Sequence, residues 1–187
     1  MGDISSILWY TIFRRTIMIT IAFFGHRRTL NKAVVQERLL NTLQEVLPQG
    51  CSKLLIGTHG DFDNIALSTC LYFKKYIRAD IDINVVLTST SFLNKDSLGY
   101  SKADFYKNKG CKTIFYDIEE VYYKSRITYS NKKMVDESDI IICCVDMNLR
   151  KSGAKTAINY AIKQNKTVIN LFSENDRLLH NKSPLRT

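Results

Sequence analysis

Several residues of types that bind phosphate groups follow apolar runs of the chain. Glycine allows the backbone to turn sharply and to approach a ligand closely, and arginine can clamp a phosphate with two parallel hydrogen bonds. A serine and a glycine that open a helix offer unpaired N–H groups and the positive end of the helix dipole. The candidate ligand-binding residues are Gly25, His26, Arg27, Gly57, Gly60, Asp63, Ser152 and Gly153.

The elements that position these residues follow from hydrophobic periodicity. Runs typical of strands buried on both faces alternate with helical stripes, which predicts βαβ crossovers and an α/β fold with a mostly parallel central sheet in three layers. Ligands of such sheets bind beyond the carboxyl ends of the strands. The predicted strands are 17–24, 53–56, 83–87, 111–116, 140–145 and 167–171, and the predicted helices are 30–47, 62–77, 104–109, 127–137 and 154–164.

Composition is that of a single globular domain. The chain has 187 residues, 45% of them hydrophobic and 24% charged, which fits one domain with a substantial core. We expect residues 18–173 to form this domain, residues 1–17 to be an extension outside it, and residues 174–187 to be a polar tail. An alternative for 1–17 is a short amphipathic helix that covers a core edge or a dimer partner.

Charge and cysteine content narrow the partners and the compartment. The formal net charge of +9 favours anionic partners such as nucleotides, nucleic acid or an acidic membrane surface, without choosing among them. The 5 cysteines include no C-x-x-C pair, so neither a disulfide framework nor a zinc site is indicated, and a cytoplasmic location fits. The apolar run 7–13 is too short to span a bilayer, so we expect no membrane partner.

Two carboxylates stand at the second strand end. Asp61 and Asp63 could hydrogen-bond ribose hydroxyls or stabilise an oxocarbenium-like state during base release. For Asp61 we favour a capping role at the helix that begins near Phe62. For Asp63, a helix-dipole role and support of a ribose or phosphate site are equally open.

Histidines and tyrosines complete the set of candidates. His26, between Gly25 and Arg27, is expected to face the pocket, and His59 less so. We expect no metal site, because a third ligand at suitable spacing is missing. The segment 121–133 mixes three tyrosines with four cations. It is consistent with ordinary packing, with stacking of a small nucleotide's base on Tyr123, Arg126 or Tyr129, or with single-stranded nucleic acid.

Together these motifs resemble the SLOG superfamily, and the opening Gly25-His26-Arg27 is most similar to its YpsA-like branch. The likeness extends through Gly57-x-x-Gly60-x-x-Asp63 to Ser152-Gly153, and covers about residues 18–172. The superfamily includes the Lonely Guy phosphoribohydrolases and the DNA-processing protein DprA. The resemblance implies a Rossmann-like fold and a nucleotide or nucleotide-derived ligand, with Gly25 and Arg27 lining the phosphate pocket.

One departure from this pattern shapes the functional prediction. Lonely Guy enzymes carry Pro-Gly-Gly-x-Gly-Thr-x-x-Glu, whose glutamate serves N-glycosidic bond cleavage, whereas residues 146–157 contain one glycine and no glutamate. We therefore expect a nucleotide-binding module or sensor. One alternative is a nucleotide N-glycosidase that uses Asp63 or Asp61 as its catalytic residue, and another is single-strand nucleic-acid binding of the DprA kind. We expect no cofactor, and a homodimer is plausible.

Overall fold

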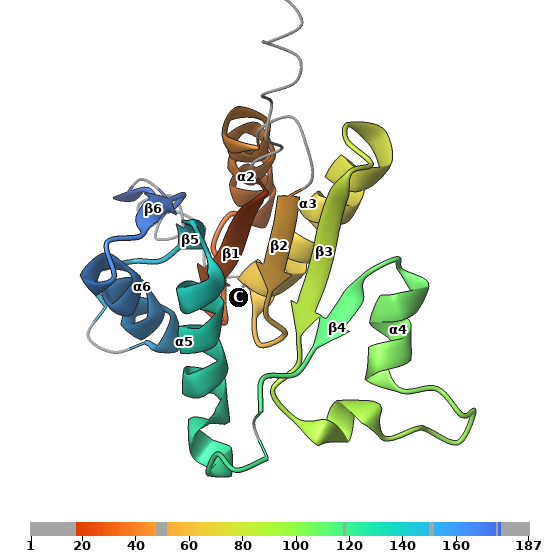
Figure 1. Ribbon diagram of the computed structural model, residues 1–187. Coiled ribbons are helices and arrows are strands. Elements are labelled where there is room, and N and C mark those ends of the chain that lie inside the picture. Colours follow the sequence, from red (N-terminus) through yellow and green to blue (C-terminus); the bar gives the residue numbers. More distant parts are fainter. Residues whose placement is uncertain (1–17, 48–51, 118, 150–151, 175, 177–187) are drawn as a thin grey trace, which may run out of the picture.

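The computed structural model of the chain describes residues 18–47, 52–117, 119–149, 152–174 and 176 (Figure 1). The predicted extension 1–17 and most of the predicted tail lie outside these ranges. Asp176, which the sequence assigned to the tail, is buried against the domain and forms an ion pair with Arg38 at 2.8 Å.

The described strands form one parallel sheet of six. Its order is β4-β3-β2-β1-β5-β6, and every neighbouring pair is parallel. The sequence prediction of an α/β fold with a parallel central sheet is confirmed. The predicted strand 111–116 is shorter than expected, because only three of its residues pair with β3. The strands are β1 (Ile19–Gly25), β2 (Ser52–Ile56), β3 (Ile81–Val86), β4 (Lys112–Ile114), β5 (Ile140–Cys144) and β6 (Thr167–Asn170).

Helices cover both faces of this sheet, which gives the three layers of a Rossmann-like sandwich. In Figure 1, α2 and α3 lie behind the sheet, and α5 and α6 lie in front of it. Short 3-10 turns, η1 (Thr90–Leu93) and η2 (Tyr123–Ser125), precede α4 and α5. The helices are α2 (Lys32–Val46), α3 (Asp61–Tyr76), α4 (Lys102–Asn108), α5 (Arg126–Glu137) and α6 (Gly153–Lys163).

The strands feed two hydrophobic cores because successive side chains point to opposite faces. In β1, Ile21 and Phe23 pack into the core under α2 and α3, whereas Ala22 and Phe24 pack into the core under α5 and α6. Both cores need apolar residues from the same strand. This explains why β1 reads as a continuous apolar run rather than an alternating one.

The strand order reverses between β1 and β5. From β1 the chain builds outward through β2, β3 and β4, and then returns to place β5 on the other side of β1. The connections on the two sides of this switch point lie on opposite faces, so a crevice opens at the carboxyl ends of β1 and β5. Open parallel sheets bind their ligands at such a crevice.

Candidate functional site

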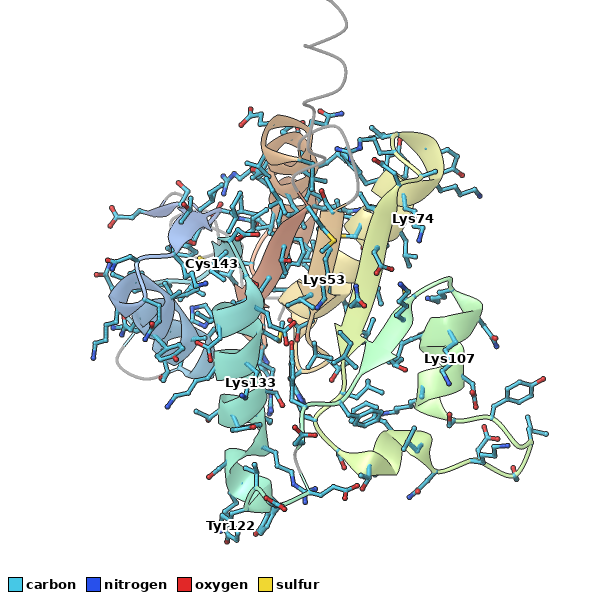
Figure 2. All side chains as sticks on the ribbon, viewed as in Figure 1. Lys53, Lys74, Lys107, Tyr122, Lys133 and Cys143 are labelled. Atoms are coloured by element: carbon cyan, nitrogen blue, oxygen red, sulfur yellow. The ribbon has the colours of Figure 1, made fainter. Side chains whose placement is uncertain are left out.

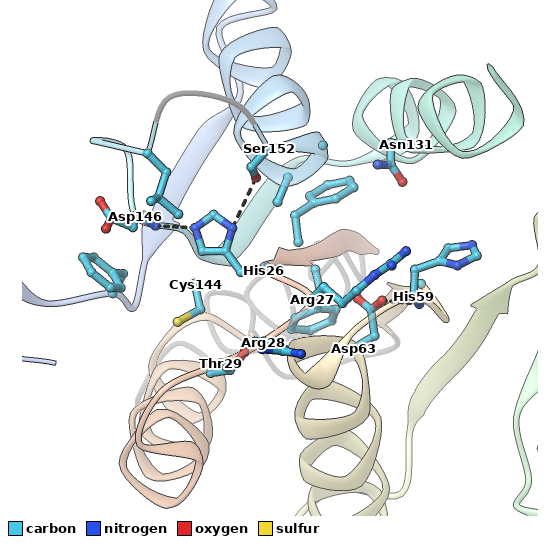
Figure 3. A pocket seen from close by; sticks show the side chains of 18 of the residues that line it. His26, Arg27, Arg28, Thr29, His59, Asp63, Asn131, Cys144, Asp146 and Ser152 are labelled. Atoms are coloured by element: carbon cyan, nitrogen blue, oxygen red, sulfur yellow. Dashed lines mark hydrogen bonds between the residues drawn. The ribbon is translucent and has the colours of Figure 1, made fainter. Parts of the chain in front are cut away.

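A cavity of about 820 Å³ lies at this switch point (Figure 3). Its size falls within the range of pockets that hold small organic ligands. Of the residues proposed from the sequence, Gly25, His26, Arg27, Gly57, Asp63, Ser152 and Gly153 line it, whereas Gly60 and Asp61 do not. The end of β1 and the start of α6, which lie far apart in the sequence, meet here.

His26 joins the end of β1 to the loop after β5. Its Nε2 accepts a hydrogen bond from the backbone N–H of Asp146 at 2.9 Å, and its Nδ1 lies 3.2 Å from Ser152 Oγ. Because Nε2 accepts, the ring is neutral and carries its proton on Nδ1, which donates to Ser152. Burial lowers the pKa of His26, against the attraction of the Asp146 carboxylate. His26 therefore fixes the cavity wall, and protonation would break its bond to Asp146.

Ser152 caps helix α6, as the sequence allowed. Its hydroxyl accepts a hydrogen bond from the backbone N–H of Lys155 at 3.2 Å. Its side chain is thus already engaged by Lys155 and His26. Gly153, the next residue, has no atom within 4 Å of the position that a Cβ would take, so the start of α6 faces open space.

Close packing of helix α3 against the loop between β1 and α2 (residues 26–31, the β1 loop) explains two of the glycines. A Cβ at Gly25 would lie 2.3 Å from Phe62 Cβ, and one at Gly60 would lie 2.9 Å from Arg27 Cα. The backbone N–H of Asp61 donates to the carbonyl of Arg27 at 2.9 Å. Gly60 therefore supports the β1 loop from behind and does not line the cavity.

Of the two carboxylates at the second strand end, Asp63 is the one that lines the cavity. Its Oδ2 accepts a hydrogen bond from the backbone N–H of His59 at 2.6 Å, and Gly57 leaves room for it, since a Cβ there would lie 3.2 Å from the same oxygen. Burial raises the pKa of Asp63 to about 6, against the two backbone donors at His59 and Gly60. Perturbed carboxyls of this kind are common at functional sites.

Asp61 has a structural role, but not the one expected. Helix α3 begins at Asp61 with Gly60 as its N-cap and no side-chain cap, so the expected capping by Asp61 is wrong. Its carboxylate instead accepts a hydrogen bond from the N–H of Thr29 at 3.2 Å and pairs with Lys32 at 3.0 Å. These contacts lower its pKa, the Lys32 hydrogen bond most. Asp61 orders the β1 loop from outside the cavity.

His59 lies on the far side of the site from His26. It lines the cavity, and its Nε2 is 2.6 Å from the Thr88 hydroxyl after β3. Burial, with the nearby Arg27, lowers its pKa. Figure 3 shows Arg27 extending between Asp63 and His59. Burial thus lowers the pKa of both histidines and favours their neutral forms.

Sequence reasoning missed many lining residues, among them the polar residues Arg28, Thr29 and Asn131. Arg28 and Thr29 continue the β1 loop, and Asn131 comes from α5. Thr29 is 8% exposed, and within the described residues its hydroxyl has no hydrogen-bond partner. A buried hydroxyl without a partner lowers stability, and this one belongs to a residue that lines the cavity. In the sequence, Arg28 and Thr29 could have been identified from the run Arg27-Arg28-Thr29 that follows the first strand.

The aromatic residues near α5 do not form a base-stacking platform at the cavity. Tyr123, Arg126 and Tyr129 are absent from its lining. Arg126 Nε donates to the carbonyl of Val121 at 3.0 Å, and Tyr129 packs against the core under α5. Tyr122, which is exposed at the far end of α5 in Figure 2, contacts Tyr123.

Metal sites, cysteines and membrane-spanning helices were the other features that could indicate a function. Over the part of the chain that is described, no group of three His, Cys, Asp or Glu side chains is placed to hold a metal ion. The four described cysteines are buried free thiols. Among the described helices, none has the length and apolar content needed to cross a bilayer.

Fold and cavity define this chain as an α/β domain of Rossmann-like architecture with a site at the switch point. No family model matches the sequence, and a search of curated proteins finds no relative.

Proposed function

We propose that the protein binds a phosphate-containing nucleotide or nucleotide-derived ligand in this cavity, as a binding module or sensor. The observation that carries the proposal is that two arginines, Arg27 and Arg28, line a cavity at the switch point of a parallel sheet. A phosphate supplies oxygens that would pair with the arginines. The resemblance to the SLOG superfamily supports the same class of ligand.

Two arginines and three aspartates line the cavity, and part of the acidic charge is offset within the protein. Asp176 lines the cavity but already pairs with Arg38, with Nη1 at 2.8 Å and Nη2 at 3.3 Å. Asp63, whose pKa is about 6, bears less charge near that pH than an ordinary carboxyl. The N-terminus of α2 adds its dipole without a side-chain cap or an acidic residue in its first turn.

The test is equilibrium dialysis against mononucleotides, cyclic nucleotides, ADP-ribose and NAD, with mass spectrometry of the retained and released compounds. We expect an intact nucleotide to be retained, and Arg27→Ala to weaken it at least about tenfold through loss of a charged hydrogen bond. Lys163→Ala removes the same charge from the exposed last turn of α6 and serves as the control. Equal effects of the two variants, or no retained nucleotide, would refute the proposal.

A nucleotide N-glycosidase is the second candidate, and Asp63 favours it. A cavity-facing carboxyl with a pKa near 6 can act as a general acid close to neutral pH. Asp61 cannot serve as the catalytic residue in this cavity, because it lies outside the cavity lining. If this candidate holds, the dialysis yields free base and ribose phosphate, and Asp63→Asn retains substrate without releasing base.

A further inference from the structure

The wall of the cavity opposite the β1 loop comes from one face of α5. Ile127, Asn131 and Met134 line the cavity, and their spacing of four and three residues places them along one side of the helix. Met134 is buried, and Ile127 remains 39% exposed. This wall is apolar except for a single amide.

Helix α5 carries three cations, yet none of them lines the cavity. Arg126 donates to the Val121 carbonyl, Lys132 lies over the Tyr160 ring at 5.5 Å, and Lys133 lies over the Tyr129 ring at 5.6 Å. Figure 2 shows Lys133 on α5. The cations of α5 therefore lie away from the cavity. The face of the helix that lines the cavity has, among the described residues, no positive charge with which to bind a phosphate.

The phosphate-binding groups stand on a different element. Arg27, Arg28 and Thr29 belong to the β1 loop, whereas Asn131 projects from α5 (Figure 3). Asn131 is half-buried, and among the described residues its amide makes no hydrogen bond. The amide offers one acceptor and two donors in a plane. A ligand that fills the cavity must thus present charge to the β1 loop and a flat, hydrogen-bonding group to α5.

We propose that this face of α5 is the base subsite and that Asn131 hydrogen-bonds the edge of the base, which rests on the nucleotide-binding function proposed above. Ile127, which is 39% exposed, offers apolar surface to the face of the ring, and the buried Met134 forms the wall behind it. Every nucleobase presents a donor and an acceptor side by side, and an amide matches such a pair. The ligand therefore retains its base, and neither a bare sugar phosphate nor a polyphosphate satisfies this wall.

The test compares AMP, GMP and ribose 5-phosphate by equilibrium dialysis on the full chain. Asn131→Asp replaces the amide by two acceptors, which match the adjacent N–H donors of guanine and repel the acceptor nitrogens of adenine. We expect the ratio of GMP to AMP affinity to rise at least about tenfold, in line with one bidentate base contact. Because the new charge also repels phosphate, each affinity is divided by that for ribose 5-phosphate on the same variant.

Two further variants keep the outcome interpretable. Asn131→Leu is expected to weaken AMP about fivefold or more and to leave ribose 5-phosphate within about twofold, since only the base loses its partner. Asn108→Asp adds the same charge at the exposed end of α4 and is expected to leave the GMP to AMP ratio unchanged. A thermal unfolding curve establishes that each variant is folded.

The possible failures are distinct. If wild type binds ribose 5-phosphate and nucleotides but Asn131→Asp leaves the base ratio unchanged, the base subsite is wrong and the nucleotide-binding function stands. If wild type binds none of the three compounds, the nucleotide-binding proposal fails, and this inference fails with it.

Discussion

At the scale of single residues, some side chains of the site are buried in a way that lowers the stability of the folded protein. Thr29 is the simplest case. Its buried hydroxyl lacks a partner in the described residues. Burying an unpaired hydroxyl costs about 1–3 kcal/mol, so this side chain does not contribute to the stability of the free protein.

We expect Thr29→Val to separate stability from binding. Valine has nearly the same shape without the unpaired hydroxyl, so the free protein should become more stable by about 1 kcal/mol, whereas nucleotide affinity should fall. Urea unfolding and dialysis measure the two effects. Ser52→Ala removes another buried, unpartnered hydroxyl at the start of β2, away from the cavity, and should leave affinity unchanged. Loss of stability in Thr29→Val would contradict this explanation.

Asp63 should make stability fall with rising pH. Its folded-state pKa of about 6 lies above the ordinary value of 3.8, so the folded state holds the proton more tightly. The contribution of Asp63 to stability is consequently fully present below pH about 4 and is lost as pH rises through 6. We expect Asp63→Asn to gain roughly 2–3 kcal/mol relative to wild type between pH 4 and pH 7.5, measured by urea unfolding. A pH-independent difference would mean that the carboxyl ionises normally.

At the scale of elements, the contact between β1 and α3 requires glycine at the end of the strand. A Cβ at Gly25 would lie 2.4 Å from Phe62 Cγ, and Phe62 is fully buried. We expect Gly25→Ala to cost about 1–3 kcal/mol, as overpacked cores do. Gly153→Ala has open space at the start of α6 and should be neutral or slightly stabilising. Equal unfolding midpoints for the two variants would contradict this packing argument.

The elements were largely predictable because burial on both faces leaves a clear sequence pattern. The predicted strand 140–145 differs from β5 by one residue, and the predicted helix 127–137 differs from α5 by one residue. The parallel sheet followed from strict alternation of strands and helices. Strand β4 was overestimated because its apolar residues Phe115 and Tyr116 pack against the cores without pairing to a strand.

The site was only partly predictable, since side-chain direction is set by tertiary packing. The strand ends located Gly25, Arg27 and Ser152 correctly at the cavity. Asn131 gave no such signal, because it lies within an ordinary helix and acquires its position only when α5 packs over β1. Asp61 and Asp63 are two residues apart, and the helix turns one outward and the other inward.

At the scale of the whole molecule, the cavity joins the two halves of the sheet. One half, β1 to β4, contributes the loops after β1 and β2, and the other, β5 and β6, contributes the loop after β5 and the start of α6. Within the described residues, His26 crosses between these halves through Asp146 and Ser152. A ligand that contacts both halves binds only when the two halves are packed together. Its binding therefore stabilises the contact between them.

Hydrogen exchange should therefore reveal the ligand as a change confined to one edge of the sheet. With saturating AMP, we expect slower amide exchange in 25–30, 57–60 and 146–149, which lie in both halves at the carboxyl ends of the strands. Residues 77–80 and 164–166 precede β3 and β6 at the opposite edge and should be unaffected. Protection limited to the β1 and β2 loops would place the ligand on one half only. Protection at the opposite edge would show that the molecule binds nucleotide somewhere other than its switch point.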